Sequence, residues 1–243
     1  MTTAIIQARL GSTRLPGKVL KNLNGKPLIE QIINRLKYCK NIDAIVLATT
    51  TSNVDDKLAN WCEENNISYF RGDENNVLKR YYDAATKYKS NVIVRVTADD
   101  PFKDPNIIDS VIEVLLNNKL DFAYNNNPPS FPEGLDTEVF TYKAIKKATE
   151  ANTTDFEKEH VTQYFYNNLQ IFKCSNFSYK ENISHIRLTV DTEQDFHLAE
   201  MIYSKLSPKG EMFYLDDILS LFKAEPDLLE INKGVKRSAL YAK

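Results

Sequence analysis

A basic turn near the N-terminus has the residue types that can hold an anion. The run RLGSTRLPGK, residues 9–18, follows a short apolar stretch and combines two glycines and two hydroxyls with three cations, Arg9, Arg14 and Lys18. Backbone N–H groups at the glycines can wrap an anion, and the cations can neutralise it. The run is not a P-loop, because its glycines are one residue further apart than that motif requires. We predict that the turn binds a polyphosphate; the alternative is a solvated basic loop.

Aspartates follow two further predicted strands. Asp99 and Asp100 come just after the apolar run 92–97, and Asp191 follows the run 183–190. Ligands of an open parallel sheet bind beyond the carboxyl ends of its strands, so these carboxylates should lie near the basic turn. Mg²⁺ usually takes one or two carboxylates, with water and phosphate oxygens as its other ligands. We predict that Asp99 and Asp191 hold Mg²⁺, although Asp191 could instead cap the next helix.

The elements that position these residues alternate along the first half of the chain. Short apolar runs predict strands at 3–8, 44–49, 67–70, 92–97 and 122–124. Apolar residues at helical spacing predict helices at 27–38, 54–65, 77–88 and 105–117, the second capped by Asn53. Continuously apolar strands between helices indicate a parallel sheet covered on both faces. The predicted fold is α/β, with a doubly wound and mostly parallel sheet.

The pattern changes after residue 124. An Asn- and Pro-rich loop precedes predicted strands at 135–140, 171–177 and 183–190, and predicted helices at 142–151, 156–168, 194–206 and 215–222. We predict a single domain over residues 1–243, with 125–181 inserted as a lid or dimerisation segment on the main sheet.

Composition excludes several classes of protein. The chain has 243 residues and a net charge of −2, so a protein that coats nucleic acid or an anionic membrane is not expected. No apolar run approaches the length of a transmembrane helix, and the N-terminus lacks the basic-then-apolar order of a signal peptide. Three widely spaced cysteines form neither a disulfide framework nor a CxxC metal motif. We expect a soluble, cytoplasmic protein.

Six blocks of sequence occur in the order of one known family. They are IIQARLGSTRLPGKVL (5–20), RGDENNVLKRYYDAA (71–85), VTADDPF (96–102), GLDTEVF (134–140), KEHVTQYF (158–165) and LTVDTEQDF (188–196). They resemble the cytidylyltransferases of spore-coat polysaccharide biosynthesis type, relatives of the CMP-sialic acid and CMP-Kdo synthetases in the nucleotide-diphospho-sugar transferase-like superfamily. The resemblance implies a Rossmann-like nucleotidyltransferase fold, CTP as co-substrate, Mg²⁺, and a homodimer joined through residues 125–181.

Residue by residue, the resemblance gives the basic turn to the CTP phosphates and gives Asp99 and Asp191 to the metal. Arg71, Asp73 and residues 77–80 fall where the family approaches cytosine and ribose. The implied nucleotide-binding set is Ala8, Arg9, Leu10, Gly11, Ser12, Lys18, Arg71, Asp73, Val77, Arg80 and Asp99. The implied catalytic set is Arg9, Arg14, Lys18, Asp99 and Asp191.

The acceptor side of the predicted site is a second polar group. Asp136 and Glu138 alternate along a predicted strand, so both should reach one face, where they could bind sugar hydroxyls or simply meet solvent. His160 could orient the acceptor or form a hydrogen bond within the fold. Asp100 stands where the Kdo branch carries a glutamate. We assign these four residues to a sugar-type acceptor.

The hypothesis that follows is cytidylyl transfer. An acceptor oxygen attacks the α-phosphorus of CTP in line and pyrophosphate leaves, with positioning and charge neutralisation carrying the reaction. A sugar-phosphate or alditol-phosphate acceptor would give a CDP-linked product instead. A non-catalytic nucleotide-binding subunit would not need the Asp99–Asp191 pair, and a glycosyltransferase would not need a triply basic turn.

Overall fold

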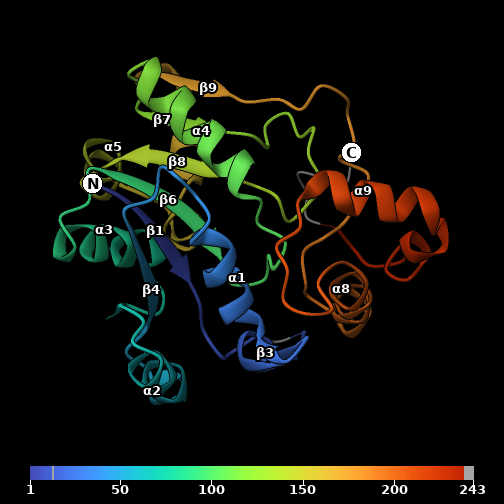
Figure 1. Ribbon diagram of the computed structural model, residues 1–243. Coiled ribbons are helices and arrows are strands. Elements are labelled where there is room, and N and C mark those ends of the chain that lie inside the picture. Colours follow the sequence, from blue (N-terminus) through green and yellow to red (C-terminus); the bar gives the residue numbers. More distant parts are fainter. Residues whose placement is uncertain (13, 238–243) are drawn as a thin grey trace.

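Seven strands form the main sheet of the computed structural model, which describes residues 1–12 and 14–237 (Figure 1). In spatial order they are β5 (Tyr69–Gly72), β4 (Ala44–Thr50), β1 (Thr2–Gln7), β6 (Val92–Thr97), β8 (Glu138–Thr141), β7 (Phe122–Tyr124) and β9 (Cys174–Asn176). β1 pairs in parallel with β4 and β6, β4 with β5, and β7 with β9. β8 runs antiparallel to its neighbours β6 and β7. The sheet is therefore mostly parallel, which confirms the predicted fold class.

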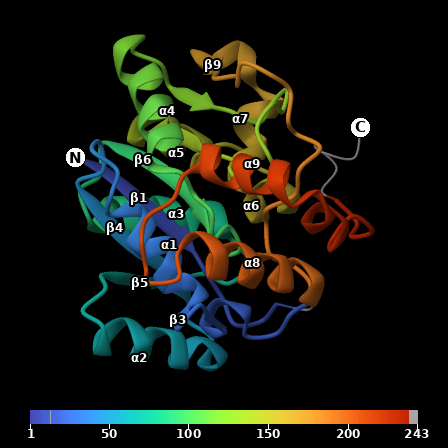
Figure 2. The same ribbon diagram turned by 45° about the vertical axis from the view of Figure 1, so that its right-hand side comes forward.

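Helices cover both faces of this sheet. One apolar cluster joins it to α1 (Leu28–Leu36), α2 (Asp56–Glu64), α4 (Pro105–Asn117), α8 (Glu193–Leu206) and α9 (Leu215–Ala224). A second cluster joins it to α3 (Val77–Lys87), α5 (Tyr142–Thr149) and α7 (Gln163–Asn167), with α6 (Asp155–Glu159) packed against α3. Figures 1 and 2 show α8 and α9, in orange and red, side by side.

Strand alternation explains the two layers. Ala4 and Ile6 of β1 are fully buried in the first cluster, whereas Ile5 between them is fully buried in the second. Successive side chains of a strand point to opposite faces, so a strand buried on both sides must be apolar throughout. The predicted bounds of strand 92–97 and helix 105–117 are confirmed.

Short elements complete the fold. β2 (Asn22–Leu23) and β3 (Lys26–Pro27) form an antiparallel pair outside the main sheet. Single 3₁₀ turns lie at η1 (Lys18–Leu20), η2 (Asn53–Asp55), η3 (Leu169–Ile171) and η4 (Pro226–Glu230).

Two predicted helices differ in the structure. The helix predicted at 54–65 begins at Asp56, after the 3₁₀ turn η2, so Asn53 does not cap it. The helix predicted at 156–168 is divided into α6 and α7, because Val161 between them adopts a φ of +45° while its side chain is fully buried. A β-branched residue rarely takes this conformation, so burial of Val161 in the core holds the break in place.

The strand predicted at 183–190 is wrong. Residues 184 and 185 form a turn, and the backbone after them bonds to two loops: Leu188 N–H donates to the carbonyl of Glu133 at 2.7 Å, and Val190 N–H to that of Asp99 at 2.8 Å. These bonds place Asp191 at the edge of the sheet, beside Asp99. The position expected for Asp191 is reached without a sheet strand.

The segment 125–181 contributes to the sheet. It supplies β8, between β6 and β7, and the edge strand β9. Its role as a lid or dimerisation segment and the single-domain organisation stay predictions. Within the described residues, every helix is too short or too polar to cross a membrane.

Candidate active site

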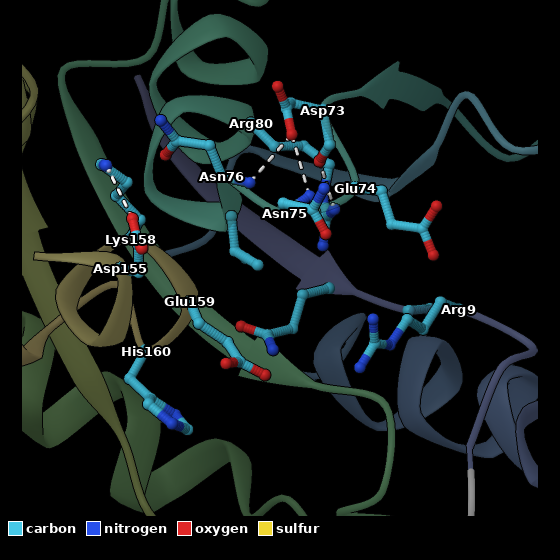
Figure 3. Close-up of a pocket in the computed structure, with 13 residues that line it drawn as sticks. Arg9, Asp73, Glu74, Asn75, Asn76, Arg80, Asp155, Lys158, Glu159 and His160 are labelled. Carbon is cyan, nitrogen blue, oxygen red and sulfur yellow. Dashed lines mark hydrogen bonds and ion pairs between the residues drawn. The ribbon is translucent and has the colours of Figure 1, made fainter.

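A pocket of about 740 Å³ opens at the carboxyl end of β1 (Figure 3). Three segments far apart in the sequence line it: residues 7–9 at the end of β1, residues 73–80 before and in the first turn of α3, and residues 155–160 in and after α6. Figure 3 shows Arg9, the Asp73 turn and Glu159 on different sides of the hollow. This is the edge of the sheet where a βα turn can present ligand-binding groups.

The turn before α3 is fixed by its own hydrogen bonds. One carboxylate oxygen of Asp73 accepts the N–H groups of Asn76 at 2.9 Å and Asn75 at 2.8 Å, and these bonds hold the pKa of Asp73 below its ordinary value. Asn76 caps α3 by accepting the N–H of Lys79 at 2.9 Å. Arg80, 3% exposed, donates to the carbonyl of Asp73 at 2.7 Å, while its buried Nε has no hydrogen-bond partner among the described residues.

A second pocket, of about 180 Å³, lies at the carboxyl end of β6. Gln7 of β1 stands opposite Thr97 of β6 in the sheet register, and these residues line the first and second pocket respectively. The two pockets are therefore neighbours. The second brings together the predicted residues Asp99, Asp100, Asp136, Glu138 and Asp191, along with Arg95, Thr97, Lys103, Glu133, Gly134 and Thr189.

Lys18 joins the basic turn to the two predicted metal ligands. Its ammonium lies 3.3 Å from Oδ2 of Asp99 and 2.9 Å from Oδ1 of Asp191, and donates to the carbonyl of Val190 at 2.7 Å. The Lys18 side chain is only 9% exposed. Arg14, more than half exposed, reaches the same oxygen of Asp191 at 2.9 Å. Carboxylates from two distant segments therefore share one buried cation.

Burial and ion pairing shift the pKa values of this cluster in opposite directions. Burial raises the pKa of Asp99, but the charge of Lys18 and hydrogen bonds from Thr97 and Lys18 hold it below its ordinary value overall. Burial lowers the pKa of Lys18, but Asp99 and Asp191 raise it above its ordinary value overall. The pKa of Asp99 is lower in the folded protein than its ordinary value of 3.8, so its ion pair stabilises the protein at neutral pH. This stabilisation is lost as the pH falls from 3.8 through the pKa of the folded protein.

Two predicted acceptor residues already have charged partners. Asp100 is buried, which raises its pKa, and pairs with the ammonium of Lys103 at 2.9 Å. Glu138 is 3% exposed, pairs with Arg95 at 2.6 Å and accepts the hydroxyl of Tyr166 at 2.8 Å. Burial raises the pKa of Glu138, but Arg95 brings it below its ordinary value overall. Both carboxylates therefore line the second pocket with their charge compensated.

Two other predicted site residues, Arg71 and His160, do not lie with the residues that share their predicted role. Arg71 pairs with Asp56 at 2.7 Å and donates to the carbonyls of Thr50 and Ser52, and it is not among the described residues that line either pocket. His160 lines the first pocket, with the turn before α3, whereas the other acceptor residues line the second.

Sequence reasoning missed the anchor of the basic turn. Asp55, 2% exposed, accepts the N–H of Leu10 at 2.7 Å and the hydroxyl of Thr50. Leu10 and Asp55 are 45 positions apart, so no local motif indicates this contact. Six further lining residues lie inside the sequence blocks that resemble the family, where their polar type was an available signal: Gln7, Glu74, Asn75, Asn76, Lys158 and Glu159.

Gly134 lets the chain pass close to the segment that carries Asp191. Its φ is +105°, and a Cβ there would lie 2.6 Å from the backbone nitrogen of Thr189. Since backbone cannot move aside as a flexible side chain can, Gly134→Ala is expected to lower the free energy of unfolding by about 2 kcal/mol. Thermal melting checks this. The matched control is Gly234→Ala, where a Cβ meets open space and the change should stay within about 0.5 kcal/mol. Equal melting temperatures for both variants would contradict the prediction.

The donor set at the second pocket fits a hard divalent cation. Among the described residues, no group of three or more His, Cys, Asp or Glu side chains is placed to hold a metal ion. Asp99 and Asp191 do converge, because both contact the same ammonium. Two carboxylates next to a basic turn match the ligands of a Mg²⁺ ion that also binds phosphate oxygens.

The chain is similar to known proteins over nearly its whole length. The family model described as cytidylyltransferase matches residues 3–228. An uncharacterized protein of Methanocaldococcus jannaschii is 36% identical, covering 97% of this chain and 96% of that protein. The spore coat polysaccharide biosynthesis protein SpsF of Bacillus subtilis is 31% identical, covering 92% of this chain and 94% of that protein. The solved structure of a cytidylyltransferase from Leptospira borgpetersenii has a TM-score of 0.88 at 33% identity, covering 94% of this chain and 96% of that one.

Proposed function

Because this chain belongs to the cytidylyltransferase family and is therefore a CTP-dependent nucleotidyltransferase, we propose that it transfers CMP from CTP to a sugar acid or related sugar, releasing pyrophosphate. The observation that carries the proposal is the buried contact of Lys18 with Asp99 and Asp191, which joins the basic turn to the second pocket. The name of the B. subtilis relative supports surface polysaccharide synthesis as the setting.

We assign the first pocket to cytosine and ribose, and the basic turn to the phosphates. A volume of about 740 Å³ is ample for a nucleoside. Asn75, Asn76 and Glu159 supply donors and acceptors to the lining, and Arg9 stands where the pocket meets the turn. His160 lines this pocket as well, so its proposed contact with the acceptor requires an acceptor that reaches across both pockets.

Mg²⁺ is the cation that we propose at Asp99 and Asp191. When bound there, it would polarise the α-phosphate and lower the pKa of the attacking hydroxyl. The chain's own cations stabilise the negative charge of the phosphates: Arg9 and Arg14 neutralise the polyphosphate and the departing pyrophosphate. Lys18 would turn its ammonium from the carboxylates to a phosphate, which its flexible stem allows.

We assign the second pocket to the acceptor. Its lining is mostly charged, which suits a polar sugar rather than an apolar group. Asp136 and Glu138 would meet sugar hydroxyls, and Asp100 with Lys103 would form the wall beside them. The sequence blocks resemble the spore-coat type, and the relationship of that type to the CMP-sialic acid and CMP-Kdo synthetases favours a sugar acid, and hence a CMP-sugar, over a phosphorylated acceptor.

Pyrophosphate release tests this function. CTP, UTP, ATP and GTP are each incubated with Mg²⁺ and a panel of 3-deoxy-ulosonic acids, sugar phosphates and alditol phosphates. We expect release from CTP with a 3-deoxy-ulosonic acid. Release only with a sugar phosphate or alditol phosphate would instead establish a CDP-linked product. Binding of CTP without release across the panel would indicate an acceptor outside the panel or the non-catalytic alternative.

We also propose a homodimer joined through residues 125–181. Two large apolar side chains of this segment are exposed, Phe156 at 57% and Ile171 at 41%. Burying such side chains in a subunit contact is favourable. Sedimentation equilibrium at micromolar concentration should give twice the chain mass of 27.9 kDa. A monomer under these conditions would rule the dimer out.

A further inference from the structure

Arg187 holds the carboxylate of Asp191 from the side away from Lys18. Its guanidinium is 4% exposed and spans three carboxylates: Nη2 lies 3.1 Å from Oδ2 of Asp191, Nε lies 2.9 Å from Asp195, and Nη1 lies 3.0 Å from Glu133. A planar guanidinium presents its donors in a fixed fork, so it orients the carboxylates that it binds as well as neutralising them.

The two oxygens of Asp191 therefore have separate partners. Oδ2 contacts Arg187, whereas Oδ1 contacts Lys18, the cation shared with Asp99. Asp195 fixes the backbone of the same turn, because its Oδ2 accepts the N–H groups of Asp191 and Thr192, both at 3.0 Å. Side chain and backbone of Asp191 are thus fixed by one buried ion pair, Arg187 with Asp195.

The C-terminal segment holds this ion pair in place. Asn232, 5% exposed, donates from Nδ2 to the carbonyl of Arg187 at 3.2 Å and to Oδ1 of Asp195 at 2.9 Å. Arg237 pairs with the second oxygen of Glu133 at 2.9 Å. Both residues follow the part of the chain, 3–228, that the family model matches.

We propose that Arg187 is a positioning residue that turns one oxygen of Asp191 toward Asp99, and that Asn232 of the C-terminal segment holds Arg187 in that arrangement. The proposal rests on the proposed function, since it requires Asp191 to bind a divalent cation. Among the described residues that line the first pocket, neither Arg187 nor Asn232 occurs. Loss of either contact should therefore weaken binding of the cation and leave binding of the nucleoside unchanged.

Manganese binding tests the proposal without the acceptor. The full chain is titrated with Mn²⁺ in the presence of α,β-methylene-CTP, and free Mn²⁺ is followed by electron paramagnetic resonance. Arg187→Lys keeps the charge but cannot bridge Asp191, Asp195 and Glu133 together. We expect its dissociation constant for Mn²⁺ to rise about 10-fold or more, the usual effect of removing a group that orients a metal ligand. Affinity for the nucleotide analogue in EDTA should stay within about twofold of the wild type.

A second variant and a control keep the test independent of folding. Asn232→Ala removes no charge and should weaken Mn²⁺ binding in the same direction, by less. Lys205→Gln breaks the ion pair of Lys205 with Glu225, whose charged atoms lie 2.9 Å apart. Lys205 lies in the last turn of α8 and lines neither pocket, so this variant should bind Mn²⁺ as the wild type does. If folded Arg187→Lys and Asn232→Ala both bind Mn²⁺ with wild-type affinity, Arg187 is structural only and the proposal is wrong. If the wild type itself binds no Mn²⁺, the proposed metal site fails, and the positioning role with it.

Discussion

Asp99→Asn is expected to abolish measurable turnover, a loss of at least about a thousandfold, while the protein stays folded. Asparagine keeps the shape of the side chain but removes the charge that faces Lys18 at 3.3 Å and that would hold the cation. The Asp99 side chain is 30% exposed, so the loss of one ion pair should cost the fold only about 1 kcal/mol. The measurement is pyrophosphate release at saturating CTP, together with thermal melting.

Asp109→Asn is the matched control for this substitution. Asp109 lies in α4, and its carboxylate accepts the backbone N–H groups of Lys40 at 2.8 Å and Asn41 at 2.9 Å, on a part of the fold that lines neither pocket. It should lose some stability and keep its turnover. Near-wild-type turnover in Asp99→Asn would overturn the assignment of Asp99 to the metal, whatever the control does.

Lys18→Met is expected to make the stability of the protein depend on a divalent cation. The change leaves Asp99 and Asp191 facing each other without their shared ammonium and removes the donor to Val190. Removing one partner of a buried ion pair costs several kcal/mol, and the partial exposure of both carboxylates reduces this to about 1–3 kcal/mol here. A divalent cation can then bind the vacated carboxylates, so Mg²⁺ should raise the melting temperature of the variant more than that of the wild type.

The same variant should turn over at least about a hundredfold more slowly, because a charge that neutralises the polyphosphate is missing. Lys26→Met is the control: its ion pair with Glu30, at 3.1 Å, is half exposed and should contribute less than about 1 kcal/mol. Melting curves with EDTA and with Mg²⁺ decide the outcome. A variant as stable as the wild type in EDTA, with no added response to Mg²⁺, would mean that the carboxylates do not depend on Lys18.

The sequence by itself determined the sheet and the residue types at its edge. Strand 92–97 and helix 105–117 are predicted within their observed bounds, because an apolar β-branched run and a proline in the first turn of a helix are strong local signals. The basic turn and the aspartates at 99 and 191 were found in the same way. Their chemistry is a property of residue types, and the parallel pairing of β1 with β6 brings the basic turn and Asp99 to one edge of the sheet.

Only the tertiary structure decided how these residues meet. The contacts of Lys18 with Asp99 and Asp191 join residues 81 and 173 positions apart, and the anchoring of Leu10 by Asp55 spans 45 positions. Local periodicity carries no information on such pairs. The segment before Asp191 was predicted as a strand, and its apolar residues Ile186, Leu188 and Val190 are buried, but Glu133 and Asp99 supply its backbone partners. Apolar side chains report burial, whereas the hydrogen-bond partners of a backbone are set by what the rest of the chain places beside it.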